Sequence, residues 1–469
     1  MTPAIDSGRG FSPLWRCLLL SLAFGALIGY ATLWYAAPIL TGDSFGYMRL
    51  ATDLRQLHIS EFHQRTPGYP LILLLTGSGS KPTLGLFYVS LAMHFASAFC
   101  VAKLVRYLGV NRWLSLTLLI VALLPPFVEP AAYVMPEAAT EFALVFAFYC
   151  LIKWLGSNRM QWGVGFAILA VLCALTRPTF QLWLPFIALG LLALWWCEVL
   201  PRRVSRHRML LTVMGAATVC GAIYFTIAWT NFRKFGEFST TSLTPYQLST
   251  RTIGVVEYLP ERFGELRALL LRHRDAYLIQ HFDDHTAQNY IYRAYPDVVK
   301  LYGGDRVKAL GAIRESSLYL ILHKPASYVG EFLKAVASFW MPMDTPLANG
   351  GSDLLKGVWL LVTMSVFALF FSQFLVAGGT VLFLLSWNLR FRRMAPFFRE
   401  NSLLASAYLL GLGIIGYNLI ISCALGIGTA RYRVPTDLLI MATTVMGFAI
   451  WQRGWRFVCQ PLEVAGGDR

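Results

Sequence analysis

An acid and an arginine lie in two short segments that are rich in glycine, proline and tyrosine. Asp43 stands between Gly42 and Ser44, and Arg65 begins the segment Arg65-Thr66-Pro67-Gly68-Tyr69-Pro70. A positioned carboxylate can act as a general base. An arginine can meet phosphate oxygens through two hydrogen bonds, and it binds a departing phosphate more strongly as that group gains charge. Proton removal coupled to loss of a phosphate group is therefore the chemistry that these residue types predict.

Each of these two residues also has a structural interpretation. Asp43 or Ser44 could cap the N-terminus of a helix over residues 47–57, a role that is compatible with catalysis. Arg65 precedes Thr66-Pro67, where the proline favours an extended backbone. Its long side chain could contact phosphate or extend to the membrane interface. We expect Asp43 to be the catalytic base.

Three further arginines are candidates for donor or phosphate binding. Arg431 and Arg433 are two residues apart, so they would share one face of an extended segment. At least one of them is expected to bind phosphate, against the alternative of headgroup or structural pairing. Arg177 lies between apolar runs, where an unpaired charge is costly. A structural pair of Arg177 with Glu137 or Glu141 is favoured over contact with a donor.

Three tyrosines, Tyr47, Tyr69 and Tyr432, accompany these charged residues. They could stack on a sugar or line a lipid groove together with Glu137, although interfacial tyrosines are common in membrane proteins. Two histidine-containing segments, 58–63 and 281–285, do not match a standard metal-binding spacing. We therefore expect no metal and no other cofactor, with a divalent cation as the alternative.

The composition predicts an all-α, polytopic membrane protein. Apolar residues make up 56% of the 469 residues, mean hydropathy is +0.55 and only 14% are charged, against about 25% in soluble domains. About ten apolar runs could span a bilayer, and helices satisfy their own backbone in lipid. The predicted spans are 16–38, 83–105, 113–128, 137–155, 160–176, 179–197, 209–230, 356–387, 402–426 and 434–451.

Charge predicts the orientation of these spans. The net charge of +15 is divided among short loops between spans, and this argues against nucleic-acid binding. Basic residues fill alternate short loops, which would place both termini in the cytoplasm. The predicted organisation is an N-terminal transmembrane catalytic module (1–230) with its first outer loop at 39–82, an outer cap (231–355) and C-terminal transmembrane helices (356–469).

Four motifs, taken in order, resemble the GT-C superfamily of integral-membrane glycosyltransferases. The first is Gly42 to Tyr47 followed by Arg65 to Pro70, which looks like that superfamily's first outer loop. Tyr133–Glu141 looks like an outer loop that leads into a span. Ala174–Pro178 resembles an "LxRP" step, and Ala430–Pro435 resembles an "RYRxP" element. The greatest likeness is to the branch that contains protein O-mannosyltransferases and the lipid A aminoarabinose transferase.

The resemblance implies transfer of a sugar from a polyprenyl-phosphate-linked donor to a hydroxyl or amine of a lipid, glycan or protein acceptor. It implies a multi-pass protein of the plasma (inner) membrane, with the active site facing the periplasm or exterior and membrane lipids around it. That branch often has Asp-Glu where this chain has Asp43-Ser44, and some members carry a soluble C-terminal domain.

Two other classes of function are open. One is a transporter or flippase of a polyprenyl-linked or anionic substrate, which would favour ionisable groups near the middle of the membrane. The other is a non-catalytic assembly protein, which would not require Asp43, Arg65 and Arg431. The central geometric prediction is that these three residues share one pocket.

Overall fold

The structure, a computed structural model, describes residues 38–57, 65–201, 205–280, 290–341, 395–426 and 429–459, with a few isolated positions between them. These residues form helices and connecting loops. The β pairing among them is an isolated parallel bridge between Ile39 and Tyr133. The prediction of an all-α fold is confirmed.

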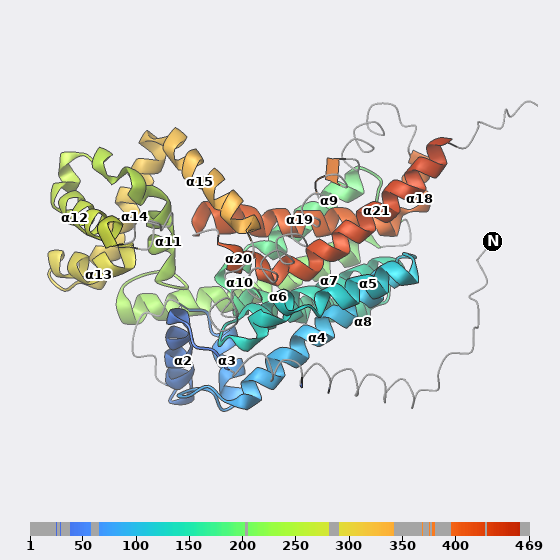
Figure 1. Cartoon of the computed structure of the whole chain (residues 1–469), viewed down its shortest axis with the longest axis horizontal. Coiled ribbons are helices and arrows are strands. Elements are labelled where there is room, and N and C mark those ends of the chain that lie inside the picture. Colours follow the sequence, from blue (N-terminus) through green and yellow to red (C-terminus); the bar gives the residue numbers. More distant parts are fainter. Residues whose placement is uncertain are drawn as a thin grey trace, which may run out of the picture.

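Long helices form a bundle in which α7 is one of the most enclosed (Figure 1). An 18-residue window of α7 is 78% buried, whereas the corresponding window of α10 is 17% buried. Hence α7 lies inside the bundle and α10 at its surface. The bundle helices are α4 (Leu84–Tyr107), α5 (Arg112–Ala122), α6 (Pro125–Val128), α7 (Glu137–Ser157), α8 (Met160–Thr176), α9 (Trp183–Trp196), α10 (Arg206–Phe235), α18 (Ala395–Glu400), α19 (Ser402–Leu425) and α21 (Asp437–Cys459).

Six helices in the described part of the chain are long and apolar enough to cross a membrane. They are Leu84–Tyr107, Glu137–Ser157, Pro178–Trp196, His207–Phe235, Ser402–Leu425 and Ala430–Trp455. The predicted span 113–128 is instead a bent pair of helices that meet at 69°, and Met160–Thr176 is a shorter apolar helix. The predicted spans 16–38 and 356–387 lie outside the described residues. The count of about ten spans and the cytoplasmic termini stay predictions.

The bend between α5 and α6 has a local cause. Pro125 and Pro126 lack the N–H groups that would continue the helix. The carbonyl oxygen of Ala122, at the end of α5, lies 3.0 Å from Nε2 of the buried His94 on α4. Such a bond satisfies a backbone group that a broken helix would otherwise leave bare in an apolar interior. Nδ1 of His94 lies 2.8 Å from Glu141 of α7, so this histidine joins three helices.

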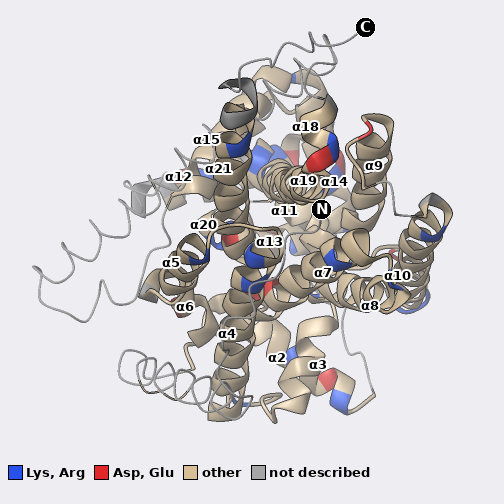
Figure 2. Ribbon diagram, turned by 90° about the vertical axis from the view of Figure 1, so that its right-hand side faces the viewer, with Lys and Arg blue, Asp and Glu red and all other residues tan. Residues whose placement is uncertain are grey.

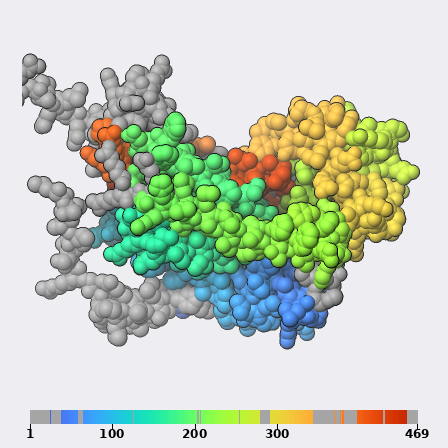
Figure 3. Space-filling model, turned by 180° about the vertical axis from the view of Figure 1, so that it is seen from behind, coloured from blue at the N-terminus to red at the C-terminus, as the bar shows by residue number. Residues whose placement is uncertain are grey.

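A lobe of shorter helices covers one end of the bundle, the end that also holds α2 (Gly42–Arg55) and α3 (Gly68–Leu75) (Figures 1 and 3). The lobe has its own apolar core, which includes Leu270, Ile291 and Leu310. The predicted boundary at residue 230 falls within α10, which continues to Phe235. The helices of the lobe are α11 (Leu243–Thr252), α12 (Gly264–Gln280), α13 (Tyr290–Leu301), α14 (Arg306–His323) and α15 (Pro325–Trp340).

Hydrogen bonds tie this lobe to the bundle. The buried Arg251 of α11 donates from Nε to the carbonyl oxygen of Gly426 at 2.6 Å, just after α19. The Tyr328 hydroxyl of α15 donates to the carbonyl oxygen of Ala424 at 2.8 Å. Charged residues are few among the otherwise tan ribbons of Figure 2. Where charged side chains do gather in the described bundle, they therefore mark a candidate functional site.

Candidate active site

Asp43 lies in the first turn of α2, and its carboxylate is not used as a helix cap. Helix α2 begins at Gly42, and the backbone N–H of Thr41 donates to Ser44 Oγ at 2.9 Å. Thr41 is the N-cap residue, so the prediction that Asp43 or Ser44 caps a helix beginning at Tyr47 is wrong. An acidic side chain in the first turn also meets the positive end of the helix dipole.

The Asp43 carboxylate bridges two arginines from distant parts of the chain. Arg65 donates from Nη2 to Oδ1 at 2.5 Å, and Arg431 donates from Nη2 to Oδ2 at 2.6 Å. Arg65 precedes α3, and Arg431 lies in the single turn α20 (Ala430–Arg433). The prediction that these three side chains share one location is confirmed. Both the acid and Arg431 are about one-third exposed, at 31% and 32% of their side chains.

Two opposing effects act on the pKa of Asp43. Burial raises the pKa, but the positive charges of Arg431 and Arg65, together with their hydrogen bonds, lower it by more than burial raises it. The net result is a pKa below the ordinary value of 3.8, so Asp43 is a carboxylate at neutral pH. A carboxylate held in this way is a weak base until a ligand draws the arginines away from it.

Arg65 is held by close packing around α2. Its guanidinium carbon lies 4.9 Å from the ring centre of Tyr47, which meets the ring of Tyr69 edge-to-face at 5.2 Å. Gly46 leaves room for the arginine, because a Cβ at that position would lie 3.3 Å from Arg65 Nε. Burial raises the pKa of Tyr47 to about 12, so its hydroxyl stays protonated at neutral pH.

Close packing between α3 and α8 explains why residue 68 is a glycine. A Cβ at Gly68 would lie 2.5 Å from the backbone carbonyl of Leu175, a distance that real side chains do not reach. Only glycine therefore lets α3 pack against the end of α8. This contact places Arg65 and Arg177 at the same end of the bundle.

Glu137 and Arg177 form a second, buried layer beneath Asp43. Glu137 is 2% exposed, and its Oε1 lies 3.6 Å from Arg177 Nη1 and 3.3 Å from Arg431 Nε. The predicted pairing of Arg177 with Glu137 is present, whereas Glu141 pairs with His94. Arg177 Nη1 and both Glu137 carboxylate oxygens have no hydrogen-bond partner among the described residues. Polar groups this deeply buried need partners, so these atoms are candidates to bind a polar ligand.

Tyr432 lies against two arginines of this region, Arg177 and Arg431. Its ring centre is 4.8 Å from the guanidinium carbon of Arg177 and 5.6 Å from that of Arg431. Cation–π contacts of this kind orient a guanidinium group. The three predicted tyrosines, Tyr47, Tyr69 and Tyr432, therefore all lie around the charged cluster, with Tyr47 and Tyr69 buried.

Arg433 faces away from the cluster. The segment that contains it is a helical turn rather than extended, so residues two apart project in nearly opposite directions. Arg433 is 1% exposed; it donates to Asp437 at 2.7 Å and to the carbonyl oxygens of Phe339 and Met341 at 2.8 Å each. The expectation that Arg431 and Arg433 share a face is wrong. Arg433 instead satisfies the C-terminal carbonyls of α15.

Two connections to the site were not predicted. Arg251 of α11 holds the loop before α20 through its bond to Gly426, so the lobe helps to position Arg431. Its single signal in the sequence is an arginine within an otherwise uncharged helix. The His94–Glu141 pair is the second, and a histidine in an apolar span gives the signal for it.

No group of three or more potential metal ligands occurs among the described residues. The histidine-containing segments 58–63 and 281–285 lie outside them. The absence of a metal site therefore stays a prediction.

Neither a scan against protein-family models nor a search of curated proteins finds a match for this chain. The feature of this chain that bears on function is the cluster itself: an accessible carboxylate, Asp43, shared by two arginines above a buried acid and a third arginine.

Proposed function

We propose that this protein is a membrane glycosyltransferase that uses a polyprenyl-phosphate-linked sugar donor. It transfers the sugar to a hydroxyl or amine of a lipid, glycan or protein acceptor at the outer face of the plasma membrane. The observation that carries the proposal is the bridge from Arg65 through Asp43 to Arg431, since three segments distant in sequence converge on it. The likeness of the motifs to GT-C enzymes supports the same function.

The charge of the cluster suits a donor with one phosphate. Arg65, Arg177 and Arg431 face two carboxylates, those of Asp43 and Glu137. If all five groups are ionised, one positive charge is left over. A sugar–phosphate–prenyl diester carries one negative charge, so its binding would neutralise the site. Arginine suits this contact because its planar donors match phosphate oxygens.

The reaction then follows from the exchange of partners. The donor phosphate takes hydrogen bonds from Arg65 and Arg431, and Asp43 loses part of the positive charge that lowers its pKa. Asp43 accepts the proton of the acceptor hydroxyl or amine as that atom bonds to the anomeric carbon. The bond between the anomeric carbon and the phosphate oxygen breaks, and polyprenyl phosphate leaves. The two arginines stabilise the negative charge that develops on it.

Glu137 has a positioning role in this scheme. Its Oε1 lies 3.3 Å from Nε of Arg431, whereas Asp43 is bound by Nη2, a different nitrogen of the same guanidinium. Arg431 can therefore turn from Asp43 to a phosphate while Glu137 still holds it. No metal or other cofactor is needed for any step.

The transporter alternative gains one observation. His94, near the middle of α4, and Glu141, about one turn from the start of α7, form a buried ionisable pair. Such groups often mark transport pathways. Both ring nitrogens of His94 already have protein partners, and one of these is the broken end of α5. A structural role accounts for the pair, so we favour the enzyme.

The direct test uses purified full-length protein with radiolabelled polyprenyl-phospho-sugars and membrane extract as a source of acceptors. The proposal predicts that one donor is consumed, that the label appears on an acceptor and that unlabelled polyprenyl phosphate accumulates. Movement of intact donor across proteoliposomes without loss of its sugar would establish a flippase instead. The absence of both activities, with full binding of donor by an Asp43→Ala variant, would favour an assembly protein.

A further inference from the structure

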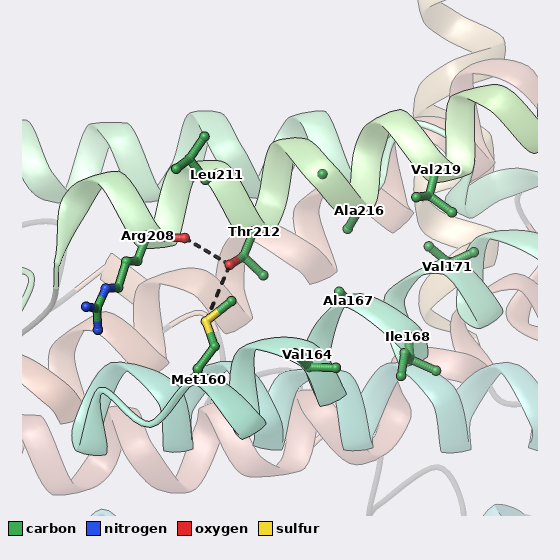
Figure 4. A pocket seen from close by; sticks show the side chains of 11 residues that line it. Met160, Val164, Ala167, Ile168, Val171, Arg208, Leu211, Thr212, Ala216 and Val219 are labelled. Atoms are coloured by element: carbon green, nitrogen blue, oxygen red, sulfur yellow. Dashed lines mark hydrogen bonds between the residues drawn. The ribbon is translucent and has the colours of Figure 1, made fainter.

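An apolar groove lies between α8 and α10, and its lining includes no residue of the charged cluster (Figure 4). Its volume is about 580 Å³, within the range of about 300–1,000 Å³ that is usual for ligand sites. Figure 4 shows side chains of the two helices facing each other across it. The lining residues are Met160, Val164, Ala167, Ile168, Val171, Arg208, Leu211, Thr212, Gly215, Ala216 and Val219.

Small residues form the bottom of the groove and larger apolar residues its edges. Ala167, Gly215 and Ala216 leave space between the helices. Ile168 and Leu211 are 65% and 69% exposed, although they are apolar. Since α10 lies at the surface of the bundle, this groove opens toward the lipid that surrounds a membrane protein.

The length of the groove matches one leaflet of a bilayer. It extends along α8 from Met160 to Val171, which is about 16 Å of helix. Half of the hydrocarbon core of a bilayer is about 15 Å thick. One acyl chain that lies along the groove would therefore have its headgroup at the Met160 end.

Arg208 lies at that end and supplies the charge that a headgroup phosphate needs. Its side chain extends beside Met160 in Figure 4, and its guanidinium has no hydrogen bond or ion pair to a described residue. It is exposed and sits in the first turn of α10. A cation in the first turn opposes the helix dipole, whereas an anion there would be stabilised by the dipole and the free N–H groups.

We propose that the groove between α8 and α10 is a binding site for one anionic phospholipid. An acyl chain lies over Ala167, Gly215 and Ala216, and the headgroup phosphate pairs with Arg208. The headgroup end is the start of α8, whereas Arg177 of the charged cluster follows the other end of that helix. The lipid site is therefore in the leaflet opposite the proposed active site, and it is independent of the proposed function.

The test is native mass spectrometry of the full-length protein after equilibration with equal amounts of phosphatidylglycerol and phosphatidylcholine. We expect the wild type to retain one phosphatidylglycerol in preference to phosphatidylcholine. Arg208→Ala should reduce that preference about fivefold, the effect of one cation near a headgroup. Gly215→Trp should abolish retention of the lipid, because it fills the groove without a clash; nothing lies within 4 Å of a Cβ built there.

Two matched variants serve as controls. Gly221→Trp adds the same side chain to α10 at a position that also has open space but does not line the groove. Arg159→Ala removes an exposed arginine next to Met160 that does not line the groove either. Both should retain the lipid as the wild type does.

Three results would overturn the proposal. The first is equal retention of phosphatidylglycerol by all five proteins, and the second is an equal loss in the controls. The third is displacement of the phospholipid by polyprenyl phosphate, which would assign the groove to the donor's chain. If one groove variant does not fold, as judged by thermal unfolding, the other still decides between these outcomes.

Discussion

Arg431 and Arg433 occupy the same helical turn, yet their surroundings differ in every respect that bears on ligand binding. Arg431 is 32% exposed and pairs with Asp43, which is itself 31% exposed. Arg433 is 1% exposed, pairs with Asp437 and also holds two backbone carbonyls of α15. Arg431 can exchange its partner for a ligand, whereas Arg433 bonds to Asp437 and to the backbone at the end of α15 and so joins these elements.

This contrast separates residue type from role. Both pairs are arginine–aspartate ion pairs with nitrogen–oxygen distances of 2.6 and 2.7 Å. Breaking a buried pair leaves an uncompensated charge and destabilises the fold, whereas a partly exposed pair costs less to separate. Substitutions in the Asp43 pair should therefore change activity, and those in the Asp437 pair should change stability.

The largest effect is expected from Asp43→Asn. This variant keeps the shape of the side chain but cannot accept a proton, so the transfer rate should fall by about 10²–10⁴-fold. The measurement is sugar transfer by purified protein, normalised to folded protein. Asp297→Asn removes an exposed carboxylate paired with Lys300 and should leave the rate unchanged. Normal transfer by Asp43→Asn would remove Asp43 as the base.

Arg433→Met should mainly reduce stability. It leaves the carboxylate of Asp437 buried without its partner, which typically costs about 3–5 kcal/mol. Chemical unfolding in detergent would measure the loss, and the double variant Arg433→Met/Asp437→Leu should recover most of it. Activity per folded molecule should stay near that of the wild type. A specific loss of activity with unchanged stability would reverse the assignment of the two arginines.

Arg431→Lys should reduce the transfer rate with little change in stability. A lysine keeps the charge but has a single nitrogen, so it lacks the planar fork with which Arg431 reaches Asp43 and Glu137 through separate nitrogens and could meet phosphate bidentately. Loss of one such electrostatic contact is expected to lower the rate by about 10²–10³-fold. Arg314→Lys, at an exposed pair with Glu237, is the control. Equal effects of the two lysine variants would show that geometry at Arg431 is unimportant.

The smallest effect is expected in the dependence of thermal stability on low pH. Because the folded pKa of Asp43 is below the ordinary 3.8, its ionisation stabilises the fold fully above that pH. That stabilisation is lost as pH falls through the lower, folded value. The difference in Tm between the wild type and Asp43→Asn should therefore shrink as the pH is lowered from 6 to 3. A constant difference over this range would contradict the ion-pair geometry.

Sequence was a good guide where one strong physical effect dominates. Apolar runs predicted helices, and the structure has α4, α7, α10, α19 and α21 where long runs were expected. The polar motifs between them led to Asp43, Arg65 and Arg431, because arginines outside the basic loops run against the positive-inside bias. The structure brings these three together.

The errors arose where several local preferences compete. Thr41, Asp43 and Ser44 can all cap a helix, and only the surrounding contacts select Thr41. The two-residue spacing of Arg431 and Arg433 predicts a shared face only for an extended segment, but the chain forms a helical turn there, so Arg433 points inward. Arg251 stands out in sequence as an arginine in an otherwise uncharged helix, but its partner could not be found, because Gly426 is 175 residues away.

The proposed function requires that Asp43, Arg65 and Arg431 form a pocket for the phosphate of a prenyl-linked sugar. The affinity of the purified protein for polyprenyl phosphate tests this pocket, compared among the wild type, Arg65→Gln, Arg431→Gln and the control Arg314→Gln. We expect each of the first two variants to weaken binding by about tenfold or more, the usual effect of losing a charged hydrogen bond, and the control to bind as the wild type does. Unchanged affinity in both Arg65→Gln and Arg431→Gln would show that these arginines do not bind the phosphate.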